Sequence, residues 1–229
     1  MRARGPRVNR RAFSALSGGR STWLLWERRP KVPGWLAVVG AGHTSPLRIT
    51  LATVAERLAA VVWEWPGRGA EHCVLERAEW GYRLAGTAAV AEGGAPYLVE
   101  YAVRADTEWR TRSVEVRCNE SFLDLSADGA GGWSAGGAEG CIDIDLGFTP
   151  STNTLPIRRA GLALGEALDL DAAWVRFPEL TLERLSQRYE RLAEDRYVYS
   201  SDGFRAELVV DSHGLVVDYE GFWRSIAHD

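Results

Sequence analysis

The chain has 229 residues, 46% of them hydrophobic, which is enough to bury a sizeable core and excludes a wholly disordered protein. Residues 1–57 hold 11 of the 27 Lys and Arg but 2 of the 31 Asp and Glu, so their net charge is +9, whereas that of residues 58–229 is −13. Because an acidic domain repels phosphates, we expect no nucleic-acid partner.

The basic stretch at residues 1–57 predicts an extension rather than a domain. Its longest apolar piece, GWLAVVGAG, is far shorter than the roughly 20 apolar residues of a membrane span and lacks the flanks of a signal peptide. We therefore expect a disordered extension at 1–57 and a single domain at 58–229. Two alternatives for the extension are a basic arm on anionic lipid and a start codon assigned too far upstream.

From Val61 onward, short β-branched and aromatic segments are separated by Gly, Pro, Asn or Asp, which predicts an all-β domain. Residues 97–103 alternate, with two Tyr and two Val on one face. A similarity between residues 87–112 and 207–224 suggests two related halves. The predicted strands are HCVLERAEW, YRLAGTAAV, PYLVEYAVRA, TRSVEVRC, SFLDLSA, AAWVRFPEL, DRYVYSS, FRAELVVD, LVVDY and FWRSI.

The segment 182–195 is ambiguous on local pattern alone. Leu182, Leu185, Tyr189 and Leu192 have helical spacing, with charged residues between them. The local spacing favours a helix, whereas the internal similarity favours a strand. Both alternatives therefore remain open at this point.

The three cysteines, Cys73, Cys118 and Cys141, show no metal-binding spacing. Buried thiols in a reducing compartment explain them best, so we expect a cytoplasmic protein without a metal or other cofactor.

Residues 128–140 contain six glycines around a single aromatic residue, Trp133. Dense glycine predicts a mobile loop or a close backbone approach. Trp133 is then either a lid over an apolar cavity or an anchor that docks the loop onto the core.

The segment GCIDIDLGFTPSTNTLPIRRAGLALG, residues 140–165, concentrates polar groups between apolar ones. On a strand, Asp143 and Asp145 face the same way, about 6.6–6.8 Å apart. We expect Arg158 and Arg159 to lie on opposite faces of a following strand, where one of them forms a bidentate ion pair with an aspartate.

Three interpretations of this polar corner compete. It is a rigid joint held by Asp–Arg pairs, a site that grips a sugar or polar head group, or a catalytic site with Asp143 and Asp145 as acid and base. A calcium site that adds Asp169 and Asp171 is less well supported, since no metal-loop pattern is present.

The corner sequence, with its pattern DxDLGxTPxTNTLPIRR, resembles the signature of a bacterial family of glycolipid-binding proteins. The resemblance extends over residues 60–226 through the blocks VVWEW, AWVRFPEL, QRY and GLVVDYEGFWR. Ser151 departs from the family pattern, where an aromatic residue is expected. The resemblance implies a spiral β-roll, similar in shape to the half-barrels that carry lipoproteins or lipids, with curved antiparallel sheets, two similar halves and little helix. It also implies strands across 182–195 and brings no catalytic residues.

We therefore expect a protein that holds the acyl chain of a glycolipid or other amphiphile in an apolar trough, with the head group at the polar corner. The alternatives are an enzyme that acts on a glycolipid or sugar conjugate through Asp143 and Asp145, and a structural or interaction protein. Neither a Ser-His-Asp arrangement nor GxSxG is evident, and the sequence does not indicate an oligomeric state. The candidate ligand-binding residues are Asp143, Asp145, Thr152, Asn153, Arg158, Arg159, Trp109, Arg110, Arg112 and Trp133.

Overall fold

The computed structural model describes residues 55–229, which belong to the compact unit Thr50–Asp229. The predicted extension at 1–57 lies outside the described residues except for its last three. The first strand begins at Glu56, so its first two residues fall on the extension side of the predicted boundary.

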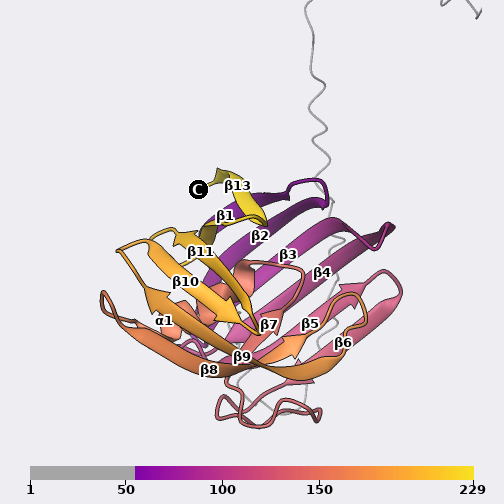
Figure 1. The fold of residues 1–229 in the computed structure, drawn as a ribbon. Coiled ribbons are helices and arrows are strands. Elements are labelled where there is room, and N and C mark those ends of the chain that lie inside the picture. The colour runs from indigo at the N-terminus through magenta and orange to yellow at the C-terminus, as the bar shows by residue number, and fades with distance from the viewer. Residues whose placement is uncertain (1–54) are drawn as a thin grey trace, which may run out of the picture. The chain divides into compact units, whose positions relative to one another are not determined.

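The described residues form one open sheet of 13 strands, which confirms the prediction of an all-β fold (Figure 1). The strands are β1 (Glu56–Trp65), β2 (Gly69–Ala78), β3 (Gly81–Glu92), β4 (Ala95–Ala105), β5 (Thr111–Cys118), β6 (Ser121–Ser126), β7 (Asp143–Leu146), β8 (Ala167–Val175), β9 (Leu182–Arg191), β10 (Arg196–Ser201), β11 (Phe204–Val210), β12 (Val216–Tyr219) and β13 (Trp223–His228). A 3₁₀ turn, η1 (Ser151–Asn153), and one helix, α1 (Thr154–Ala160), follow β7.

Two antiparallel meanders, β1–β6 and β8–β13, make up almost the whole sheet. They join where β13 pairs antiparallel with β1, so strands from the two ends of the domain are neighbours. Strand β7 pairs with β8 in parallel at the opposite end of the second meander. Figure 1 shows the purple strands of the first meander and the orange and yellow strands of the second curving around β7 and α1.

The inside of the curved sheet is filled by two hydrophobic clusters. The first combines β1–β6 with β7, β8, β13 and the corner, and includes Trp63, Phe148 and Leu155. The second combines α1 with β9–β12, and includes Ile157 and Leu208. Leu155 belongs to the first cluster and Ile157 to the second, so α1 packs against both.

The corner corrects one prediction, because Arg158 and Arg159 lie on helix α1 and not on a strand. Pro156 is in the first turn of this helix, where its missing N–H has no intrahelical partner to lose. The helix ends at Gly161, which adopts the left-handed conformation with φ of 55°. Its seven residues are far fewer than a membrane span needs, and no described helix is long and apolar enough to cross a membrane.

The ambiguous segment forms strand β9, which confirms the strand prediction for 182–191. Along its whole length β9 pairs with β8, while β10 pairs only with residues 187–191. Backbone pairing on both sides outweighs the helical spacing of the leucines.

Candidate functional site

A pocket of 270 Å³ lies where the two halves meet the polar corner. We call it the aromatic pocket, because seven of its fourteen lining residues are Trp, Tyr or Phe. The lining residues are Trp65, Asp145, Leu146, Gly147, Thr149, Asn153, Trp174, Leu185, Tyr199, Ser201, Phe204, Tyr219, Phe222 and Trp223.

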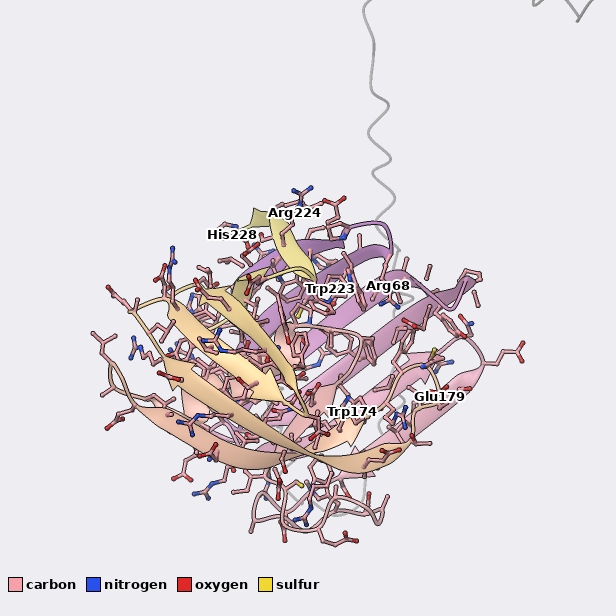
Figure 2. All side chains as sticks on the ribbon, viewed as in Figure 1. Arg68, Trp174, Glu179, Trp223, Arg224 and His228 are labelled. Atoms are coloured by element: carbon pink, nitrogen blue, oxygen red, sulfur yellow. The ribbon has the colours of Figure 1, made fainter. Side chains whose placement is uncertain are left out.

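The rings of the aromatic pocket support one another across the junction of β1 and β13. Trp65 at the end of β1 has its ring centroid 4.8 Å from that of Trp223 at the start of β13. Phe222 then meets Phe204 edge-on at 5.2 Å. Figure 2 labels Trp223 and also Trp174, which reaches the pocket from β8. Such mutual packing holds the walls in fixed orientations before any ligand arrives.

Asp145 is the one carboxylic acid in the lining of the aromatic pocket. Burial raises the pKa of Asp145 from 3.8 to about 6, opposed by a hydrogen bond that Nε2 of Gln187 donates to its Oδ2 over 2.5 Å. An ionised carboxylate can accept about four hydrogen bonds. Asp145 therefore has acceptor capacity to offer a ligand that brings hydroxyl groups.

Asn153 lies beside Asp145 in the pocket lining and is held from two sides. Its Oδ1 accepts a hydrogen bond of 2.8 Å from the hydroxyl of Tyr189, and its Nδ2 donates to the carbonyl of Pro150 over 3.0 Å. Two of the predicted residues, Asp145 and Asn153, thus reach one pocket.

Asp143, two residues from Asp145, has a different partner. Its carboxylate receives a bidentate pair from Arg159, with Nε 3.0 Å from Oδ1 and Nη2 2.5 Å from Oδ2. This confirms the predicted Asp–Arg pair. Burial still raises the pKa of Asp143, although Arg159 opposes the shift. Because Asp143 is buried and engaged, it cannot act with Asp145 as a free acid–base couple on a shared ligand.

A buried glutamate, Glu71 on β2, lies behind the aromatic pocket. Its Oε1 accepts hydrogen bonds from the hydroxyls of Tyr101 at 2.5 Å and Thr149 at 2.8 Å. Its Oε2 has no hydrogen-bond partner among residues 55–229, and burial raises the pKa of Glu71 from 4.5 to about 8. Ser151, which departs from the family pattern, is fully buried, and its hydroxyl lies within hydrogen-bond distance of the Tyr101 hydroxyl, at 2.8 Å. It is therefore part of this cluster and not of the pocket wall.

Four other predicted residues surround a second hollow of 480 Å³, which we call the basic hollow. These residues are Trp109, Arg110, Arg158 and Arg159. The ring of Trp109 stacks on Tyr82 at 3.7 Å, and the guanidinium of Arg158 lies 5.5 Å from its centroid. The predicted residues thus separate into two groups instead of forming one site.

The side chains of the remaining three predicted residues form hydrogen bonds with backbone groups. The hydroxyl of Thr152 accepts a hydrogen bond from the amide of Leu146 over 3.3 Å. Arg112 donates to the carbonyl of Asp128. The indole of Trp133 donates to the carbonyl of Cys141 over 2.8 Å and packs against the core, as expected of an anchor for the glycine-rich loop.

The aromatic walls of the pocket were not predicted from the sequence. Trp65, Trp174, Phe222 and Trp223 nevertheless stand in the blocks VVWEW, AWVRFPEL and GLVVDYEGFWR that carried the resemblance. They come from three places in the chain, so only the strand order of the sheet brings them together.

The curved sheet and the aromatic pocket define an all-β protein with a partly polar pocket between its two halves. The family model described as "Putative glycolipid-binding" matches residues 60–225, and the chain belongs to this family. A crystal structure of a DUF1089 family protein from Pseudomonas aeruginosa is similar, with 30% identity and a TM-score of 0.54 over 83% of this chain and 99% of that one. No curated protein matches the chain.

Proposed function

We propose that the protein binds a glycolipid, with a sugar ring of the head group in the aromatic pocket. The observation that carries this proposal is the position of Asp145, a desolvated carboxylate with spare acceptor capacity among aromatic rings. A sugar ring offers hydroxyl donors at its edge and apolar C–H groups on its faces, so it matches both features. An acyl chain in the same place would leave the carboxylate with Gln187 as its only donor among the described residues while excluding water from it, which is costly.

The volume of the aromatic pocket also supports an orientation in which the sugar ring, and not the acyl chain, lies in the pocket. A volume of 270 Å³ is just below the range of about 300–1,000 Å³ for sites that bury a drug-sized ligand. One sugar ring is compatible with it, whereas a whole glycolipid is too large. The half-exposed rings of Trp174, Phe204 and Phe222 then offer an apolar surface for the first part of the acyl chain.

The enzyme alternative has less support from the geometry. Hydrolysis of a glycoside commonly uses two carboxyl groups that flank the scissile bond. Within residues 55–229 the aromatic pocket has one, Asp145, because Asp143 is paired with Arg159 outside its lining. We therefore place the binding role first.

Replacement of Asp145 by Asn tests this role directly. We expect the intact protein to bind octyl glycosides of glucose, galactose or mannose, measured by calorimetry and by fluorescence of the pocket tryptophans. Asp145→Asn should weaken that binding about tenfold or more, since a hydrogen bond to a charged group contributes about 1.5–3 kcal/mol. Wild-type affinity should also fall as the pH drops through about 6, where Asp145 gains a proton, and the Asn variant should lack this dependence.

Asp124→Asn, on the exposed face of edge strand β6, is the matched control and should bind as the wild type does. Unchanged affinity in Asp145→Asn would refute the proposal. Release of free sugar by the wild type, lost in Asp145→Asn, would favour the enzyme alternative.

A further inference from the structure

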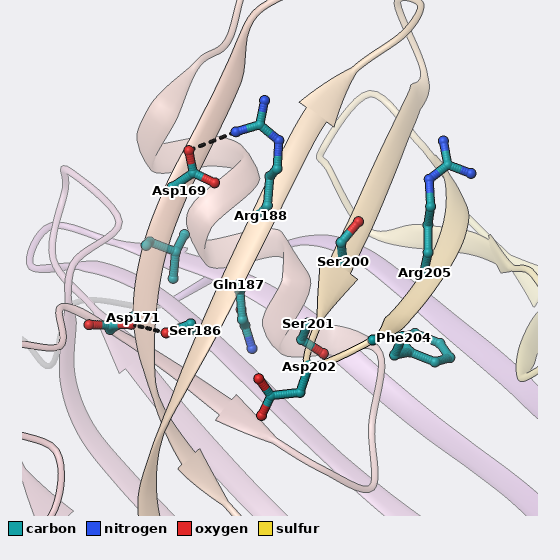
Figure 3. A pocket seen from close by; sticks show the side chains of 12 residues that line it. Asp169, Asp171, Ser186, Gln187, Arg188, Ser200, Ser201, Asp202, Phe204 and Arg205 are labelled. Carbon is teal, nitrogen blue, oxygen red and sulfur yellow. Dashed lines mark hydrogen bonds and ion pairs between the residues drawn. The ribbon is translucent and has the colours of Figure 1, made fainter.

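A polar groove of 770 Å³ adjoins the aromatic pocket at the turn between β10 and β11. Ser201 and Phe204, the last paired residues before this turn, line both hollows. Figure 3 shows the groove with the turn residue Asp202 between Ser201 and Phe204. The two hollows therefore adjoin at the tip of one hairpin.

The strand pairing explains why an opening exists at this tip. Strand β10 ends at Ser201, opposite Gln187 of β9. Residues 182–186 of β9 continue beyond it and pair with β8 alone. The edge of β9 that faces the hairpin is thus without a strand partner there, and Leu185 of this stretch lines the aromatic pocket.

A row of polar side chains crosses four neighbouring strands along the groove. The register places Asp169 opposite Arg188, Arg188 opposite Ser200, and Ser200 opposite Arg205. Three strand spacings of about 4.8 Å give this row a length of roughly 14 Å. The row is therefore long enough to contact several polar groups of one ligand.

Part of the groove is already engaged and part is free. Asp169 pairs with Arg188 at 2.7 Å, and Ser186 donates to Asp171 over 2.6 Å, as the dashed lines in Figure 3 mark. By contrast, the side chains of Ser200, Asp202 and Arg205 form no hydrogen bond or ion pair with any described residue. These three bring a hydroxyl, a carboxylate and a guanidinium to the end of the groove nearest the aromatic pocket.

We infer that the head group has at least two sugar units, the second of which lies in the polar groove. The inference rests on the proposed function, because it assumes that the first unit occupies the aromatic pocket. A second sugar leaving that pocket past Ser201 meets Asp202 and Arg205, which can accept from and donate to its hydroxyls. The charged lining of the groove does not favour an acyl chain, since burial of charged groups against methylenes is unfavourable.

The test compares monosaccharide and disaccharide glycosides that carry the same alkyl chain. Octyl glucoside is paired with octyl maltoside, and octyl galactoside with octyl lactoside, and affinities are measured by calorimetry below the concentrations at which they form micelles. We expect the intact protein to bind the disaccharide of at least one pair about tenfold more tightly, as one added charge-assisted hydrogen bond predicts.

Two variants locate the gain in the groove. Arg205→Gln and Asp202→Asn should each reduce the disaccharide affinity towards that of the monosaccharide and leave monosaccharide binding unchanged. Asn tolerates the positive φ of 35° at position 202, so this variant keeps the turn. Arg196→Gln is the matched control, because Arg196 lies on the same strand as Ser200 but pairs with Glu207 outside the groove.

The outcomes separate this inference from the proposed function. Equal affinity for both members of every pair, with monosaccharide binding still dependent on Asp145, would overturn the inference alone. A disaccharide gain that survives both groove variants, or an equal loss of both ligands in them, would also overturn it. Absence of binding to every glycoside would remove the proposed function and the inference with it.

Discussion

Glu71, Asp143 and Asp145 are three carboxyl groups withdrawn from water within one region of the domain, and their partners differ. Asp143 has the guanidinium of Arg159, Asp145 has one amide donor, and Glu71 has two hydroxyl donors. Burial raises the pKa of each group. Where no cation lies beside a buried carboxyl group, its removal from water on folding disfavours the ionised form.

Because the folded protein disfavours the ionised form of Glu71, its free energy of unfolding depends on pH. The pKa of Glu71 is about 8 in the folded protein and 4.5 as the model value for the unfolded chain. Its stabilising contribution is therefore complete below pH 4.5 and is lost as the pH rises through 8, by on the order of a few kcal/mol. Glu71→Gln keeps an oxygen for Tyr101 and Thr149 but cannot ionise. Its free energy of unfolding should fall less than that of the wild type between pH 6 and 8, above the range in which Asp145 titrates.

Urea unfolding at several pH values checks this expectation. Glu100→Gln, a change at an exposed position of β4, should follow the wild-type slope. Parallel slopes for wild type and Glu71→Gln would mean that Glu71 does not carry the pH dependence.

At this scale the sequence supported the Asp–Arg pair but not the glutamate cluster. Asp143 and Arg159 stand in one short motif, so their contact needs little knowledge of the fold. The partners of Glu71 are 30 and 78 residues away in the chain, on β4 and in the corner. Alternation on β2 places Glu71 on the same face as Cys73 and Leu75, which marks it as buried, but no local pattern names its donors.

At the scale of the elements, the pairing of β3 with β4 requires a glycine at the position where the ring of Tyr101 lies against the neighbouring strand. Gly86 pairs with Tyr101 across the two strands. A Cβ at position 86 would lie 2.6 Å from Cε1 of the Tyr101 ring. The tyrosine is buried and its hydroxyl is tied to Glu71, so the ring has little freedom to move away.

Gly86→Ala should therefore destabilise the protein by about 1–3 kcal/mol, the usual cost of forcing extra atoms into a packed core. Gly136→Ala, in the glycine-rich loop, should cost much less, because the nearest atom to its Cβ is 3.4 Å away on an exposed glutamate side chain. Thermal unfolding followed by circular dichroism compares them. A similar loss in both variants would show that backbone freedom, and not the ring of Tyr101, sets the requirement for glycine at 86.

Element prediction succeeded where strands were marked by turns and failed where helix and strand patterns overlap. Corner residues 154–160 form a helix because Pro156 fits a first turn and Gly161 ends it, although the arginines follow an apolar run that also suits a strand. For β9 the local pattern was ambiguous and pairing with β8 decided the outcome. Both cases depend on neighbours that the local sequence does not contain.

At the scale of the whole domain, the junction of β1 with β13 determines both the fold and the candidate site. An all-β fold with two halves could be predicted from the sequence. The junction of the two meanders through the first and last strands of the chain could not, because it pairs segments about 160 residues apart. The aromatic pocket is built at this junction, which is why its walls were not predicted.

A substitution of Trp223 tests how much the junction of β1 with β13 contributes to stability, since Trp223 is 4% exposed and packs on Trp65 across the two halves. Trp223→Ala should lower the free energy of unfolding by about 3–5 kcal/mol, as expected for a large aromatic removed from a core. Trp80→Ala removes the same atoms from a side chain that is 44% exposed at the end of β2, so its cost should be far smaller. Denaturant unfolding measures both, and glycoside binding should weaken in Trp223→Ala alone because it also removes a pocket wall. Equal losses of stability would mean that the two halves are held together mainly by α1 and the corner, and the junction of β1 with β13 would then be a consequence of the fold instead of a support for it.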